Sequence, residues 1–296
     1  MGETLAENKV VLTARARDGE EYSVCFLPGK GMNFISFRKG DIEAIDQSTS
    51  PLFEERFAGL GALIGPHFHR RKPEVIPQVE NESLFPHIAR VKAKGVVEPF
   101  SHGIGRYAPW KVVSVTENTL KATLKGDDTW EGVSLKDLEG QNFEMEYEAK
   151  LTPEGLAISL AVSGETESVV GLHTYYDLAG GGSLKSRVQN EYRVEGNWEP
   201  IPSSWEYQPD HTLTYPVKNA TDFGFRPFPD PLHGEILLQT LSHQVKVAYS
   251  CDNEENSFQV YHPEGASYVC IEPLSAQNPL KPKLTTNRLH ILISIQ

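Results

Sequence analysis

The feature that most constrains this chain is an alternation of apolar and polar residues with a period of two. Alternation of this kind puts every second side chain on one face of a β-strand, so each segment can bury one face. Residues 10–16 and 22–27 follow this pattern and flank Asp18-Gly19, a strong signal for a hairpin turn. The chain therefore begins with a predicted pair of antiparallel strands.

Further strands are predicted along the rest of the chain. They cover residues 32–37, 111–115, 120–124, 143–151, 156–162, 169–176, 191–194, 235–240, 244–249, 257–261, 268–272 and 288–295. Helical periodicity is almost absent, because Gly and Pro interrupt every long segment. Many short strands separated by turns predict an all-β protein, an antiparallel sandwich or barrel. No shift in composition marks a boundary, so we expect residues 1–296 to form a single domain.

The last predicted strand, residues 288–296, is strongly apolar. Leu289, Ile291, Ile293 and Ile295 share one face of it. We interpret it as a core strand rather than an edge that pairs between subunits, because exposed apolar edges invite aggregation.

Charge and composition exclude several classes of function. Lys and Arg total 28 and Asp and Glu total 40, which gives a net charge of −12 and a poor general surface for nucleic acid or anionic membrane. No segment approaches the ~20 apolar residues of a membrane span. The N-terminus lacks the apolar core of a signal peptide, and Cys25, Cys251 and Cys270 form no CxxC pair. We expect a cytoplasmic protein without a disulfide framework.

One polar region follows Gly65-Pro66. On a strand, His67 and His69 would lie on the same face, and Arg70, Arg71 and Lys72 follow directly. This pattern is typical of a clamp for an anion or a hydroxyl, or of a metal site. A solvated end of a loop would have the same composition.

Residues 99–110 form a second candidate region. His102 precedes Gly103, and glycine allows a backbone to approach a ligand closely. Tyr107 and Trp110 offer aromatic faces on which a sugar can stack. In the alternative reading, the segment is a turn whose aromatic residues belong to the core.

Two predicted strands carry the remaining candidates. His173, Tyr175 and Asp177 alternate on one strand face, where unpaired polar groups would be costly in a dry core. Glu272 ends another apolar strand, and desolvation there would raise its pKa towards the range useful to a general base. A solvated edge-strand glutamate is the alternative.

In this order and spacing, the four regions resemble the aldose 1-epimerase (galactose mutarotase-like) family over most of the chain. The best match is residues 171–178, Gly-Leu-His-Thr-Tyr-Tyr-Asp-Leu, where the family usually has His-Ser-Tyr-Phe-Asn-Leu. Residues 269–273 resemble the segment with the family's catalytic glutamate. Ser101-His102-Gly103, followed by Trp110, resembles the segment with its other active-site histidine.

Two further matches are looser. Residues 61–70 resemble a Gly-Arg-x-Ala-Asn-Arg segment whose final arginine contacts sugar hydroxyls; Arg70 takes that position, with Arg71 as the near alternative. Asp222 resembles a substrate-binding aspartate. The chain departs from the family at His69, where Asn is usual, and at Pro66, where Arg is frequent.

The resemblance implies a large antiparallel β-sandwich and an isomerase that interconverts α and β anomers of a hexose or hexose phosphate. No metal or organic cofactor is implied. Glu272 would be the base and His173 the acid, with His102, Asp222 and Asp177 around the sugar. A carboxylate such as Asp177 or Glu272 would favour the imidazolium form of His173.

Three alternatives remain open at this point. Gly61-x5-His67-x-His69-x4-Glu74 matches most of the first metal-binding motif of the cupins, although Asn81 replaces its closing Gly. A non-catalytic carbohydrate-binding protein on the same fold is the second. In the third, the chemistry is kept and the cations of residues 70–72 bind the phosphate of a hexose 6-phosphate.

Overall fold

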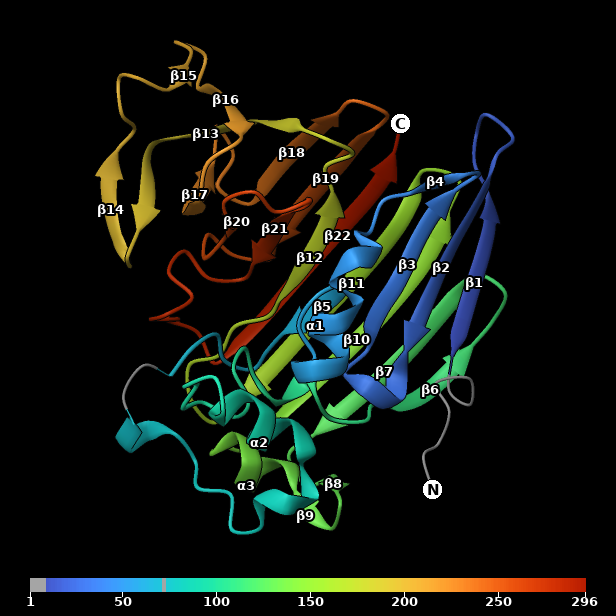
Figure 1. The fold of residues 1–296 in the computed structure, drawn as a ribbon, viewed down its shortest axis with the longest axis vertical. Coiled ribbons are helices and arrows are strands. Elements are labelled where there is room, and N and C mark those ends of the chain that lie inside the picture. Colours follow the sequence, from blue (N-terminus) through green and yellow to red (C-terminus); the bar gives the residue numbers. More distant parts are fainter. Residues whose placement is uncertain (1–8, 71–72) are drawn as a thin grey trace.

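Two antiparallel sheets form the body of the protein (Figure 1). The computed structural model describes residues 9–70 and 73–296. In order of pairing, the first sheet consists of β1 (Val10–Arg15), β2 (Glu21–Leu27), β3 (Asn33–Lys39), β5 (Gly61–Ile64), β12 (Gly171–Asp177), β21 (Tyr268–Leu274), β20 (Ser257–His262), β17 (Thr221–Pro227), β13 (Gly182–Val194) and β14 (Asn197–Pro200). The short β4 (Ile42–Glu43) pairs with β3.

The second sheet contains the C-terminal strand. In order of pairing, it consists of β6 (Lys111–Val115), β7 (Thr119–Lys125), β10 (Phe143–Thr152), β11 (Gly155–Gly164), β22 (Thr286–Ile295), β19 (Gln244–Cys251), β18 (His233–Thr240), β13, β16 (Thr212–Val217) and β15 (Glu206–Tyr207). Strands β8 (Thr129–Trp130) and β9 (Val133–Ser134) form a separate pair.

Strand β13 belongs to both sheets. Its first half pairs with β16 and β18, and its second half pairs with β17 after a shift in register between Val188 and Tyr192. A bulge of this kind bends a strand and turns it from one sheet into the next. The two sheets are therefore continuous through β13.

The core lies between the sheets. Buried and exposed residues alternate strictly along most of β10, as expected for a strand with one face in the core. Phe26 of β2 meets Tyr147 of β10 edge to face, with ring centroids 6.0 Å apart. Aromatic pairs of this geometry add to the free energy gained from burying the two rings.

Short helices lie outside the sheets. In the described part of the chain they are α1 (Ser50–Arg56), α2 (Pro86–Lys92) and α3 (Leu135–Glu139), together with the 3-10 turns η1 (Pro28–Lys30), η2 (Gln47–Thr49), η3 (Pro73–Val75), η4 (Glu82–Leu84) and η5 (Ile104–Arg106). Figure 1 shows α2, α3 and the β8–β9 pair together at one end of the sheets. Within residues 9–70 and 73–296, no helix is long and apolar enough to cross a membrane.

The predicted fold class is confirmed, and the strands occur close to their predicted positions. Asp18-Gly19 does join two paired strands. The closing strand β22 pairs with β11 on one side and β19 on the other, so it is a core strand as predicted. Strands β5, β14, β16, β17 and most of β13 were not predicted. The four residues of β5 are all buried and show no alternation, so the period-two pattern could not reveal it.

Candidate functional site

A cavity of about 950 Å³ opens beside the middle of the first sheet. Strands β12, β13, β17, β20 and β21 line it together with the loops around His69, His102 and Leu280. The cavity brings together four of the predicted site residues, His102, His173, Asp222 and Glu272. A second concavity, of about 1120 Å³, lies across β11, β22 and β19, and none of the predicted site residues lines it.

Glu272 and His173 meet on neighbouring strands. Strands β12 and β21 pair directly, which brings Glu272 Oε1 to 3.3 Å from His173 Nε2. Glu272 is only 1% exposed, and burial, with a smaller effect of the Asp222 charge, raises its pKa to about 8. The rise is in the direction that the position of Glu272 at the end of an apolar strand predicted.

The electrostatics of His173 differ from the expectation. Burial, and then the positive charge of Arg106, lower the pKa of His173 well below its usual value. The direction of this shift opposes the expectation that a nearby carboxylate holds His173 as the imidazolium, because burial and the Arg106 charge both disfavour the protonated ring. Both His173 Nδ1 and Glu272 Oε2 are buried without a hydrogen-bond partner among the residues described.

His102 is fixed by its backbone. It has a left-handed conformation with φ 71°, which costs free energy for a residue other than glycine. Its N–H donates to the Phe68 carbonyl and its carbonyl accepts from the Gly65 N–H, both at 2.8 Å. A Cβ on Gly103 would lie 2.0 Å from the Gly65 oxygen. The glycine therefore allows two backbone segments to meet, rather than a backbone to meet a ligand.

Asp222 is held at the cavity by Gln259, which is itself held by Arg193. Gln259 donates a hydrogen bond from Nε2 to Asp222 Oδ1. Arg193 in turn donates from Nη2 to Gln259 Oε1 at 2.7 Å. These two hydrogen bonds fix the orientation of the Gln259 amide, so the Asp222 carboxylate has a defined position at the cavity wall.

Arginines of the cavity were missed by the sequence reasoning. Arg106 is 4% exposed, and its Nε donates to the Leu63 carbonyl at 2.9 Å. Its Nη2 is buried without a hydrogen-bond partner among the described residues. Arg56 and Arg193 line the same cavity. Arg106 follows Gly105 within the candidate region 99–110. The sequence analysis assigned the sugar-binding cation to the basic residues at 70–72 instead.

Arg70 lies elsewhere than the resemblance implies. It does not line the cavity, and its guanidinium donates to the side chain of Glu139, 3.0 Å away, and to the Glu139 carbonyl. The assignment of Arg70 to the sugar is therefore not supported by its position. Arg71, the near alternative, lies outside the described residues, as does Lys72.

Asp177 and Trp110 also lie away from the cavity lining. Asp177 Oδ1 accepts a hydrogen bond from the Ala179 N–H, in the turn after β12. Trp110 is buried in the core and donates from Nε1 to the Gly105 carbonyl. The reading of Trp110 as a core residue is the correct one.

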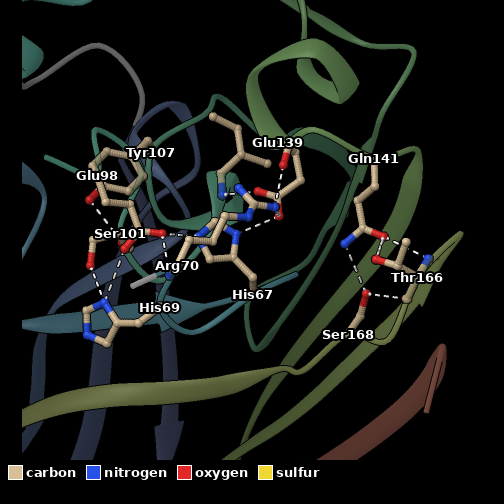
Figure 2. Close-up of polar contacts among 11 residues, drawn as sticks. His67, His69, Arg70, Glu98, Ser101, Tyr107, Glu139, Gln141, Thr166 and Ser168 are labelled. Carbon is tan, nitrogen blue, oxygen red and sulfur yellow. Dashed lines mark hydrogen bonds and ion pairs between the residues drawn. The ribbon is translucent and has the colours of Figure 1, made fainter. Parts of the chain in front are cut away.

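The residues of the cupin-like motif do not converge. His67 lies between two carboxylates, with Nδ1 2.6 Å from Glu139 and Nε2 2.8 Å from Glu98 (Figure 2). Glu74 is an exposed residue of η3. No group of three His, Cys, Asp or Glu side chains that could hold a metal ion occurs in the described part of the chain.

No protein-family profile and no curated protein matches the sequence. Solved structures do match. A putative aldose 1-epimerase from Escherichia coli aligns over 98% of this chain and 100% of its own, with a TM-score of 0.65 and 13% identity.

Two further structures agree with this result. A galactose mutarotase-like protein from Lactobacillus casei covers 96% of this chain and 100% of its own, with a TM-score of 0.64 and 11% identity. An aldose epimerase homologue from C. elegans covers 97% and 99%, with a TM-score of 0.62 and 11% identity. Identities this low support a shared fold and leave the activity to be argued from the site. The chain has the galactose mutarotase-like fold over nearly its whole length.

Proposed function

We propose that this protein is an aldose 1-epimerase-type isomerase, which interconverts the α and β anomers of a hexose or hexose phosphate. The observation that supports this most is the Glu272–His173 pair, 3.3 Å apart and buried at a cavity large enough for a sugar. Each residue of the pair has a polar atom without a partner among the described residues. Buried polar atoms without a partner are rare in folded proteins, which is consistent with a water molecule or a ligand at this pair.

Anomer interconversion needs two proton transfers. The C1 hydroxyl loses a proton as the C1 carbonyl forms, and the ring oxygen gains a proton as its bond to C1 breaks. Rotation about C1–C2 and the reverse steps then close the ring on the other face. A positioned acid and base typically contribute about 10²–10⁴-fold each.

Glu272 acts as the base and His173 as the acid in this proposal. Because the pKa of Glu272 is raised to about 8 and that of His173 is lowered, the pair holds one proton at neutral pH, mostly on the carboxyl group. Transfer of that proton across the 3.3 Å contact produces the carboxylate and the imidazolium that the reaction uses. The pair has the same net charge whether the proton is on Glu272 or on His173.

The other polar groups would bind and orient the sugar. His102, Asp222 and Arg106 line the cavity, and in this proposal Arg106 makes the contact that was expected of Arg70. Arg106 Nη2, which has no hydrogen-bond partner among residues 9–70 and 73–296, suits an electron-rich oxygen, either of a hydroxyl or of a phosphate.

Replacement of the base tests the proposal. We expect Glu272→Gln to lower the rate of anomer interconversion at least about 100-fold, measured by polarimetry or NMR on glucose, galactose and glucose 6-phosphate. Glu264→Gln, in the exposed turn between β20 and β21, is the matched control and should keep the full rate. A full rate in Glu272→Gln would refute the assignment. Sugar binding without any acceleration by the unmodified protein would favour a carbohydrate-binding role.

A further inference from the structure

A buried ionic cluster lies beside the cavity, and one of its members, Glu98, lines the cavity. It consists of His67, Glu98, Glu139 and Arg70 (Figure 2). The Glu139 side chain is 0% exposed, and that of Glu98 is 9% exposed. Buried carboxylates are costly unless they are paired and hydrogen-bonded, so the cluster must form as a unit.

His67 determines the charge of the cluster. Burial by itself would lower the pKa of His67, but the Glu139 and Glu98 carboxylates raise it above its usual value. Each ring nitrogen faces a carboxylate oxygen, so the ring donates through both N–H groups as an imidazolium. Burial would likewise raise the pKa of Glu98, yet hydrogen bonds from His67 and His69 lower it to about 2. Glu98 is therefore an ionised group that only accepts hydrogen bonds.

The acceptor character of Glu98 determines the direction of the next hydrogen bonds. Its Oε2 lies 3.3 Å from His69 Nδ1, so this nitrogen must carry a proton. Ser101 Oγ lies 3.0 Å from the same nitrogen and must accept from it as well. The hydroxyl hydrogen of Ser101 then points to its other neighbour, His102 Nδ1, also 3.0 Å away.

We infer that Glu98 and Ser101 are positioning residues that hold His102 in the tautomer with the proton on Nε2. His102 then presents an N–H donor to a ligand in the cavity, and the ligand must offer an oxygen acceptor there. Burial lowers the pKa of His102, with a smaller contribution from Arg106, which is consistent with a neutral ring. The inference concerns the binding step of the proposed function, and its tautomer can be measured without any turnover.

Histidine ring nitrogens report the tautomer directly. We expect long-range ¹H–¹⁵N spectra of the labelled, full-length protein to show His102 with a protonated Nε2 and an unprotonated Nδ1. The spectrum of His102→Gln assigns the signals. A wild-type His102 that carries its proton on Nδ1, or on both nitrogens, would overturn the inference. This measurement needs no variant of Glu98 or Ser101.

Variants of Ser101 test the hydrogen bonds that connect His69 to His102 through this serine. Ser101→Ala removes the donor to His102 Nδ1, so we expect a mixture of the two tautomers, whereas Ser101→Thr keeps the hydroxyl and should keep the wild-type signals. Ser163→Ala, which removes an exposed hydroxyl on β11, is the matched control. Unchanged His102 signals in a folded Ser101→Ala would also refute the inference.

Kinetics separate this positioning role from the chemistry. Loss of one oriented hydrogen bond is worth about 1 kcal/mol, so Ser101→Ala should raise KM for galactose or glucose about fivefold while kcat changes less. Wild-type protein without turnover would refute the proposed function and leave the NMR result to decide on the tautomer. An unchanged KM together with a mixed tautomer would show that His102 does not donate to the sugar.

Discussion

Replacement of Glu272 by Gln is expected to stabilise the protein, by an amount that depends on pH. In the unfolded chain, Glu272 ionises near its ordinary pKa of 4.5, whereas in the folded protein burial keeps it protonated up to about pH 8. Between these values the folded state binds one more proton than the unfolded state, so the free energy of unfolding falls as the pH rises. Glutamine has no proton to lose and escapes this penalty.

The size of the effect follows from the two pKa values. Each pH unit inside the window costs about 1.4 kcal/mol, so the wild type should lose about 2 to 3 kcal/mol between pH 5 and pH 7 that Glu272→Gln retains. The contributions of other titrating groups, such as the buried histidines, largely cancel when the two proteins are compared at the same pH.

Urea unfolding followed by tryptophan fluorescence measures this difference. Wild type, Glu272→Gln and the exposed control Glu264→Gln are compared at pH 5, 6 and 7, and linear extrapolation gives each free energy of unfolding. The difference in free energy of unfolding between Glu272→Gln and wild type should grow with pH. The difference between the control Glu264→Gln and wild type should not. Parallel pH profiles for wild type and Glu272→Gln would show that the carboxyl group is not buried as described.

Three further results are expected. If the Glu272–His173 pair must hold one proton, kcat/KM should fall above about pH 8 as that proton is lost, and a pH–rate profile that stays flat to pH 10 would contradict this. Gly103→Ala should destabilise the fold by at least about 2 kcal/mol in urea unfolding, because the new Cβ meets the Gly65 oxygen at a positive φ; wild-type stability would refute that reasoning. Arg106→Lys should weaken sugar binding about tenfold in titration calorimetry, and equal affinity would exclude Arg106 from the sugar site.

Most of the fold could be predicted from local pattern. Strands such as β10 and β22 bury one face each, so apolar residues recur at every second position of their sequences. Strand β5 escaped prediction because both of its faces are buried. Strand β13 was missed for most of its length because Ser186, one of the buried residues in its alternating part, is polar and weakens the apolar pattern.

The site was only partly accessible to sequence reasoning. His102, His173, Asp222 and Glu272 were identified from local patterns and resemblance, and the cavity brings all four together. The position of Arg70 does not fit its assignment to the sugar. A run of cations at residues 70–72 stands out in the sequence, yet Arg70 is bound to a glutamate almost seventy positions away, a partner that no local pattern reveals.

The sequence by itself determined the class of the fold and the residue types available for acid–base chemistry. The pairing of β12 with β21 decided that Glu272 and His173 meet, and burial decided their pKa values. Tertiary structure also decided which cation reaches the cavity and which hydrogen bonds orient His102. The physical reason is that alternation is a local property of a strand, whereas desolvation, ion pairing and hydrogen-bond direction depend on groups that only folding brings together.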